Sequence, residues 1–264
     1  EGRVELRFCP GGVMGNDQSV IRKIRAGQLQ GGALSASGLG SIYPDFQAYS
    51  MPLLFDDYRE VDLVRPQIDP LISAGLQQAG FANFGIGEGG FAYLMSNKPI
   101  HSPEEMSGQK VWIPEGDRVA QAALDAVNIA PIPLPMTDVL TGLQTGLLDT
   151  VANIPVGTIA LQWHTRVRYL SHMPLVYSYG ALVIQESALS RLEPKDRQVL
   201  QQVLERSFQD INAKIRADDA AAMEALKAQG IELIAASKEG LKQWRRQVKA
   251  AIDRLVAQGF MSAG

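Results

Sequence analysis

A single long helical pattern, over residues 194–229, constrains the fold of this chain more than any other feature. At about 1.5 Å per residue, an unbroken helix of this length spans on the order of 50 Å, which exceeds the width of one small lobe. The pattern therefore predicts a packed scaffold helix in an elongated, two-lobed molecule. Its apolar side chains recur at three-, four- and eight-residue steps, the spacing of one helix face: Leu200, Leu204, Phe208, Ile211, Ile215, Met223 and Leu226.

Short strand-like runs, separated by helical stretches, fill the rest of the chain. They indicate α/β layering and not an all-α or all-β domain. Ser237 and Gly259 are expected to cap and end a helix that follows the last run. Cys9, directly after the first run, is expected to be a small buried residue, and a single cysteine rules out an internal disulfide. The runs are residues 3–8, 31–37, 81–87, 91–97, 110–114, 130–135, 150–155, 166–171, 175–185 and 231–235.

Two segments of the chain repeat the same order of parts. The segments IRKIRAGQLQGGALSASG (21–38) and LTGLQTGLLDTVANIPVG (140–157) each read as a helix, a short strand and a loop of small and polar residues. Gly27 and Gly146 are the matching helix-ending glycines. This repeat predicts that each lobe brings a strand end and a loop to one shared place, where open α/β sheets bind ligands.

Composition and motifs argue against several functional classes. A net charge of −3 is not that of a nucleic-acid-binding protein. No apolar run approaches the roughly 20 residues of a membrane span, and one cysteine cannot form a thiolate metal cluster. HExxH, GxSxG and P-loop motifs are missing from the sequence. The glycine-rich FGIGEGG (84–90) precedes a strand and reads as a hinge. We therefore predict no catalytic residue, no metal and no cofactor.

The candidate site consists of polar and aromatic residues near strand ends. This composition is typical of a mostly apolar cleft with a few placed polar groups, which suits recognition better than turnover. Asn153 offers a donor and an acceptor, although it also suits a turn before Pro155. The candidates are Ser35, Ser37, Glu88, Phe91, Tyr93, Trp112, Asn153, Tyr177 and Tyr179.

From Arg3 to about Gly259 the chain resembles the periplasmic substrate-binding subunit of TRAP transporters, the DctP-like family. The resemblance implies a two-lobed, type II-like periplasmic-binding-protein fold with mixed sheets, a periplasmic location and removal of a signal peptide. It also implies that the ligand passes to a small and a large integral membrane subunit. The segments that carry it are GGVMGNDQSVIRKIRAGQLQGGALSASGL (11–39), YSMPLLFDDYREVD (49–62), MSNKPIHSPEEMSGQKVWIP (95–114) and LPMTDVLTGLQTGLLDTVANIP (134–155).

Two departures from the family pattern matter. Proteins that resemble this one usually begin with a further strand and helix, which are absent from the given sequence. In KVWIP, Trp112 stands where the family places an arginine that grips a ligand carboxylate. A second basic residue of the family would fall near Phe91 and is also absent. Arg118 is the candidate to replace the arginine that is missing at position 112. Asn153 matches a polar residue that contacts ligand in similar proteins.

These observations predict a solute-binding protein whose ligand is not a simple dicarboxylate but an organic acid or a metabolite with an aromatic or apolar part. Trp112 and Phe91 would form walls, Asn153 would orient the ligand, and Glu88 would favour a cationic or hydroxyl group. The expected lobes are residues 1–87 and 88–180, with residues 181–264 as the scaffold of both. Two alternatives remain open: a cytoplasmic ligand sensor of the same architecture, and an enzyme on a related fold.

Overall fold

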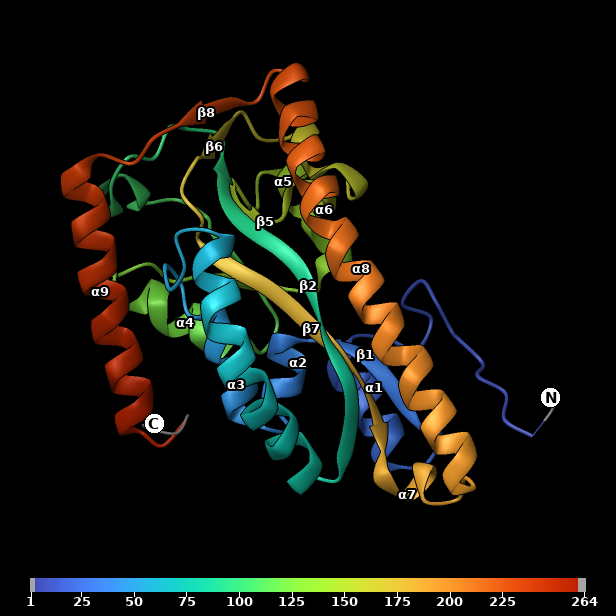
Figure 1. The fold of residues 1–264 in the computed structure, drawn as a ribbon. Coiled ribbons are helices and arrows are strands. Elements are labelled where there is room, and N and C mark those ends of the chain that lie inside the picture. The colour runs from blue at the N-terminus through green and yellow to red at the C-terminus, as the bar shows by residue number, and fades with distance from the viewer. Residues whose placement is uncertain (1–2, 261–264) are drawn as a thin grey trace.

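The computed structural model of the protein describes residues 3–260. It shows two β-sheets that share β2 (Phe81–Ser96) and a separate two-stranded parallel sheet of β3 (Trp112–Pro114) and β4 (Ile132–Leu134). Figure 1 shows helices on both sides of these sheets, with α8 running along one side of the molecule and α9 along the other. The first sheet has the strand order β1-β7-β2, and the second continues through β2, β6 and β8, with β5 also paired to β2. The predicted α/β, two-lobed architecture with mixed sheets is confirmed.

Most of the strands are short, and the two long ones are β2 and β7. The strands are β1 (Gly31–Ser35), β2 (Phe81–Ser96), β3 (Trp112–Pro114), β4 (Ile132–Leu134), β5 (Thr150–Asn153), β6 (Tyr169–Ser171), β7 (Val176–Gln185) and β8 (Glu232–Ile234). The α-helices are α1 (Asp17–Arg25), α2 (Ala36–Gly40), α3 (Tyr58–Gln78), α4 (Arg118–Asp125), α5 (Val139–Thr145), α6 (Pro155–Ala160), α7 (Glu186–Leu189), α8 (Pro194–Ala228) and α9 (Lys238–Ala257). Four short 3-10 turns lie at Pro44–Ser50, Pro103–Met106, Met136–Asp138 and Trp163–Thr165.

The long strand β2 joins the two lobes. Residues 81–92 pair with β7, and residues 93–96 pair with β5, so the strand leaves one sheet and enters the other near Ala92. The predicted runs 81–87 and 91–97 are therefore one strand. Two register shifts interrupt its pairing with β7, and Gly85 and Gly90 have positive φ angles there. Such bulges bend a strand and increase its twist, which fits the predicted role of residues 84–90 as a hinge.

The predicted scaffold helix is α8, a helix of 35 residues. Leu200 and Leu204 pack with Phe84 and Ile184, whereas Leu226 packs with Val151 and Trp163 of the other lobe. One helix thus contributes apolar side chains to the cores of both lobes. The predicted cap of α9 is also confirmed, because the Ser237 side chain accepts a hydrogen bond from the Gly240 amide.

The predicted strand at residues 3–8 is wrong, because residues 4–10 form no regular secondary structure. Its apolar residues are exposed, Phe8 by 71%, and Cys9 is exposed and not buried as expected. The alternating pattern of this segment has the period of a strand, but a strand also needs a neighbour to accept its backbone hydrogen bonds. In the described part of the chain no strand lies beside it.

Within residues 3–260, no helix is long and apolar enough to cross a membrane. The predicted lobe boundaries at residues 87 and 180 fall inside strands β2 and β7 and not in loops between elements. They remain predictions.

Candidate functional site

The two segments that repeat in the sequence form two similar helix–strand–helix units. One unit consists of α1, β1 and α2, and the other of α5, β5 and α6. Gly27 and Gly146 both adopt left-handed backbone conformations, with φ angles of 73° and 72°, after the first helix of each unit. β1 ends at Ser35 and β5 ends at Asn153, so each unit presents a predicted site residue at its strand end.

On the lobe I side, the carboxylate of Asp17 fixes the turn between β1 and α2. It accepts hydrogen bonds from the backbone amide and the hydroxyl of Ser35, with the amide at 3.1 Å. The hydroxyls of Ser35 and Ser37 lie 3.0 Å apart, so the structure brings these two predicted residues together. A Cβ atom on Gly38 would lie 2.3 Å from Asp17 Oδ2, so only glycine allows this approach. Asp17 therefore occupies the polar strand end of lobe I.

A hydrogen bond crosses from this strand end to lobe II. Asn16 caps α1 by accepting from the Ser19 amide, and its side-chain amide donates to Glu115 Oε2 at 3.2 Å. Glu115 follows β3, whose parallel neighbours end at the same edge of the lobe II sheet. The two lobes are therefore in contact where their strand ends meet.

On the lobe II side, Asn153 lies at the end of β5 opposite Tyr93 of β2. Its Oδ1 accepts from the Ile154 amide at 2.9 Å, which is the turn role that the sequence left open. Its Nδ2 is buried and has no hydrogen-bond partner. A buried N–H donor without a partner lowers the stability of the fold. An acceptor on a bound ligand could therefore pair with Asn153 Nδ2. The ring of Tyr93 is stacked on His172, with 6.4 Å between the ring centroids.

Trp112 lies in the lobe II core, and 4% of its surface is exposed. Its indole N–H donates to the Leu134 carbonyl at 2.9 Å, and its ring packs edge to face with that of Trp163 at a centroid distance of 5.2 Å. The indole therefore has an aromatic neighbour and a partner for its only polar atom. In this structure it fills the space beneath the strand ends and does not form an open wall.

Phe91, Tyr179 and Glu88 lie in the core of lobe I. Phe91 and Tyr179 both pack against the ring of Tyr177, and the Tyr179 hydroxyl donates to the Phe46 carbonyl. Burial raises the pKa of both tyrosine hydroxyls above the ordinary value. The structure gives these aromatic residues a packing role.

Glu88 is the centre of a buried ion-pair network. Its side chain is 4% exposed, and its Oε1 accepts from Arg65 at 2.9 Å and from Arg216 at 2.8 Å. Arg65 also binds Asp69, and Arg216 also binds Asp62. Hydrogen bonds from Arg216 lower the pKa of Asp62 below its ordinary value. The network ties β2 to α3 and α8, and both oxygens of Glu88 are already in use.

A second buried acid, Asp219 of α8, lies next to the crossing point of β2. A Cβ atom on Gly90 would lie 3.1 Å from its carboxyl group and 3.3 Å from the Tyr58 hydroxyl. Asp219 Oδ1 and Tyr58 Oη are buried without hydrogen-bond partners. Burial raises the pKa of Asp219 to about 6, and burial, with a smaller effect of Asp219, raises that of Tyr93 to about 12.

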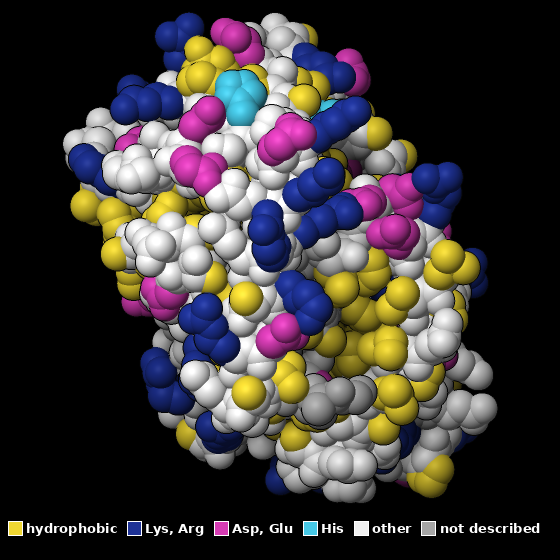
Figure 2. All heavy atoms as spheres, turned by 90° about the vertical axis from the view of Figure 1, so that its left-hand side faces the viewer, with side chains coloured by type: hydrophobic (Ala, Val, Ile, Leu, Met, Phe, Trp, Pro, Cys, Tyr) yellow, Lys and Arg dark blue, Asp and Glu magenta, His cyan; other side chains and the backbone are white. Residues whose placement is uncertain are grey.

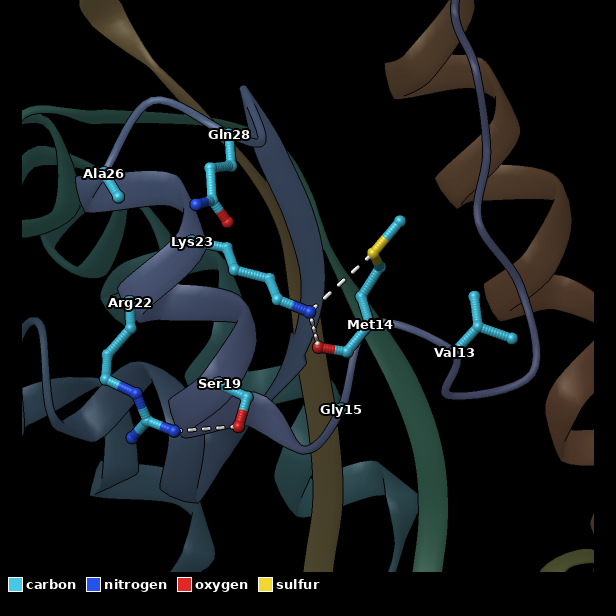
Figure 3. A pocket seen from close by; sticks show the side chains of 8 residues that line it. All are labelled: Val13, Met14, Gly15, Ser19, Arg22, Lys23, Ala26 and Gln28. Atoms are coloured by element: carbon cyan, nitrogen blue, oxygen red, sulfur yellow. Dashed lines mark hydrogen bonds between the residues drawn. The ribbon is translucent and has the colours of Figure 1, made fainter.

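Arg118 and a pocket beside α1 lie apart from these residues. Arg118 is exposed, and its guanidinium lies 4.5 Å from the ring centroid of Phe260. A pocket of about 480 Å³ lies between α1 and the loop before it, and Figure 3 shows Lys23 reaching the Met14 carbonyl there. None of the predicted site residues lines this pocket. Within residues 3–260, no group of three or more His, Cys, Asp or Glu residues has metal-binding geometry.

Sequence reasoning missed several polar residues that the structure places around the strand ends and the bulged part of β2: Asn16, Asp17, Tyr58, Arg65, Glu115, Arg216 and Asp219. Only the α1 cap left a local signal, because Asn16 directly precedes a helical pattern. The partners of Arg65 and Arg216 are up to 154 residues away in sequence, so no local pattern reveals them.

Comparisons with known proteins agree with this architecture. The solute-binding protein of Sulfitobacter sp. NAS-14.1, a TRAP periplasmic protein solved with β-D-galacturonate, has a TM-score of 0.89 and 18% identity; the match covers 97% of this chain and 85% of that one. The C4-dicarboxylate-binding periplasmic protein DctP of Rhodobacter capsulatus is 21% identical over 87% of this chain and 69% of its own length. The sialic acid-binding periplasmic protein SiaP of Vibrio cholerae is 20% identical, over 99% and 82% respectively.

The match to a family extends over nearly the whole sequence. Residues 1–258 match the bacterial extracellular solute-binding proteins of family 7, DctP. This match confirms the predicted family and the prediction of a binding protein and not an enzyme. The named relatives are periplasmic proteins, as the resemblance implied for this chain. The chain thus belongs to the DctP family of bacterial extracellular solute-binding proteins.

Proposed function

We propose that this protein captures a small organic ligand between its two lobes and delivers it to the membrane subunits of a TRAP transporter. Family membership and the two strand ends that meet at the Asn16–Glu115 contact support this proposal. The ligand would lie against Ser35 and Ser37 on one lobe and Asn153 on the other. Trp112 would shape the floor from beneath, and opening of the lobes would be needed for it to touch ligand.

We further propose that the ligand is not a simple dicarboxylate. The observation that carries this is the burial of an indole at position 112, with its N–H satisfied by Leu134. Among the described residues, no Arg or Lys donates to Ser35, Ser37, Asp17, Trp112 or Asn153. Hydrogen bonds to charged groups contribute roughly 1.5–3 kcal/mol each, so a carboxylate at these strand ends would lack its usual stabilisation. Among the similar proteins, one was solved with β-D-galacturonate and one is named for binding C4-dicarboxylates. The proposal places the ligand of this chain outside the second class.

A thermal-shift screen of a metabolite library against the purified protein tests both statements. We expect an aromatic or apolar-bearing acid or a hydroxyl-rich metabolite to raise the melting temperature, and succinate and malate to have little effect. For the ligand found, Asn153→Ala should weaken binding about tenfold, because a hydrogen bond to a ligand contributes roughly 1–3 kcal/mol. Calorimetric titration measures this change.

The matched control is Gln78→Ala, which removes a side-chain amide from the exposed end of α3 and should leave affinity unchanged. Strong stabilisation by simple dicarboxylates, with Trp112→Arg making no difference to their affinity, would overturn the ligand proposal. Equal affinity of the Asn153→Ala and control variants would remove Asn153 from the site.

A further inference from the structure

The last helix of the protein presents a stripe of cations to solvent. At 3.6 residues per turn, five cations fall within a sector of about 100° on α9: Lys238, Lys242, Arg245, Arg246 and Lys249. All five are exposed. Figure 2 faces the side of the molecule that carries α9 and shows Lys and Arg side chains following one another down the middle of the surface. With a rise of about 1.5 Å per residue, the 20-residue helix extends this stripe over roughly 30 Å.

The charge of α9 is opposite in sign to that of the protein. The helix contains six Lys and Arg residues and two acids, whereas the whole chain has a net charge of −3. The rest of the chain therefore has a net charge of −7, so α9 attracts an anionic partner more strongly than the rest of the chain does on average. Such a separation of charge orients a protein as it approaches a charged surface.

The opposite side of α9 holds the helix in place. Trp244, Val248, Ala251 and Leu255 are buried, and Leu255 packs with Val119 of α4. Two of the cations have acidic partners: Arg245 pairs with Asp56 and Lys249 with Asp253. In the part of the chain that the structure describes, Lys238, Lys242 and Arg246 form no ion pair. A rigid helix thus holds three free cations outward.

We propose that this stripe of α9 docks the protein on the anionic headgroups of a lipid bilayer. A compact ligand would need a pocket with converging donors, whereas a long row of exposed cations fits a laterally extended anionic surface. Each cation near such a surface strengthens association by roughly fivefold, so three to five cations give weak, reversible, salt-sensitive docking. This docking would serve the proposed function, because a binding protein held at the membrane finds the membrane subunits of its transporter faster.

Sedimentation with vesicles tests this inference on the full chain. We expect binding to vesicles of equal parts phosphatidylglycerol and phosphatidylcholine at low salt, and loss of that binding at high salt or with phosphatidylcholine alone. The double variant Lys242→Glu with Arg246→Glu should bind the anionic vesicles at least tenfold more weakly. The matched control, Lys195→Glu with Arg206→Glu, makes the same charge change on exposed residues of α8 and should bind as the wild type does.

A second variant, Lys238→Gln with Lys242→Gln, keeps the test valid if charge reversal disturbs folding, and it should bind several-fold more weakly. Three outcomes would overturn the proposal: no binding to anionic vesicles, equal binding to neutral ones, or equal loss in the α8 control. If the true partner is an acidic protein surface, we expect the first outcome, no binding to anionic vesicles. The ligand screen is independent of vesicles, so failure of the docking surface and failure of the proposed function are distinguishable.

Discussion

Replacing Glu88 by glutamine is expected to lower the free energy of unfolding by about 3 kcal/mol. The substitution keeps the shape of the side chain but removes the buried charge that accepts from both Arg65 and Arg216. Breaking a buried ion pair by removing one partner costs about 3–5 kcal/mol, because the remaining charges stay desolvated. Asp69 and Asp62 still pair with the two arginines, which places the expected loss at the lower end of this range.

Urea unfolding followed by circular dichroism measures the effect. The matched control is Glu224→Gln, which removes an exposed partner of Lys227 on the same α8 helix. Exposed pairs contribute about 0–1 kcal/mol, so the control should be close to the wild type. If the two variants lose the same small amount, the Glu88 network does not hold α3, β2 and α8 together.

Asp219→Asn is expected to stabilise the protein at pH 8 by about 2 kcal/mol. The folded-state pKa of Asp219 is raised from 3.8 to about 6 by burial, so ionised Asp219 destabilises the fold. The stability that protonated Asp219 contributes is fully present below pH 3.8 and is lost as the pH rises through about 6. Asparagine stays neutral and removes this loss.

Melting temperatures between pH 4 and pH 8 test this prediction. The wild type should lose stability between about pH 4 and pH 6 relative to the Asp219→Asn variant, and the difference should stay constant above pH 7. Asp218→Asn is the control, because Asp218 is the exposed neighbour of Asp219 on the same helix. Parallel pH profiles of the wild type and the Asp219 variant would show that Asp219 ionises normally in the folded protein.

Features with a strong local signal could be predicted from the sequence. The apolar period over residues 194–229 predicted α8 to within one residue of its observed end. The repeat of segments 21–38 and 140–157 predicted two similar helix–strand units, with strands expected over 31–37 and 150–155 and observed to end at Ser35 and Asn153. The signal was local, because glycines that end helices can be recognised in the sequence. These elements give the two strand ends of the candidate site.

Which face of a strand meets the core could not be predicted in the same way. Glu88 and Phe91 lie on a bulged part of β2 where the alternation of faces is broken, and their neighbours come from distant elements. Burial of Glu88 depends on Arg216, which is 128 residues away. The segment 3–8 failed for the opposite reason, because its local strand pattern has no partner in the described chain. Tertiary contacts decide these cases.

The sharing of β2 between two sheets also affects the order in which the protein folds. The lobe I sheet combines residues 31–35 and 81–92 with residues 176–185, and the last of these strands lies between the other two. During synthesis this sheet is incomplete until residue 185 has left the ribosome, and α8 follows later still. Such non-local pairing slows folding and leaves strand edges open in the nascent chain. The lobe I sheet therefore forms only after most of the chain has been synthesised.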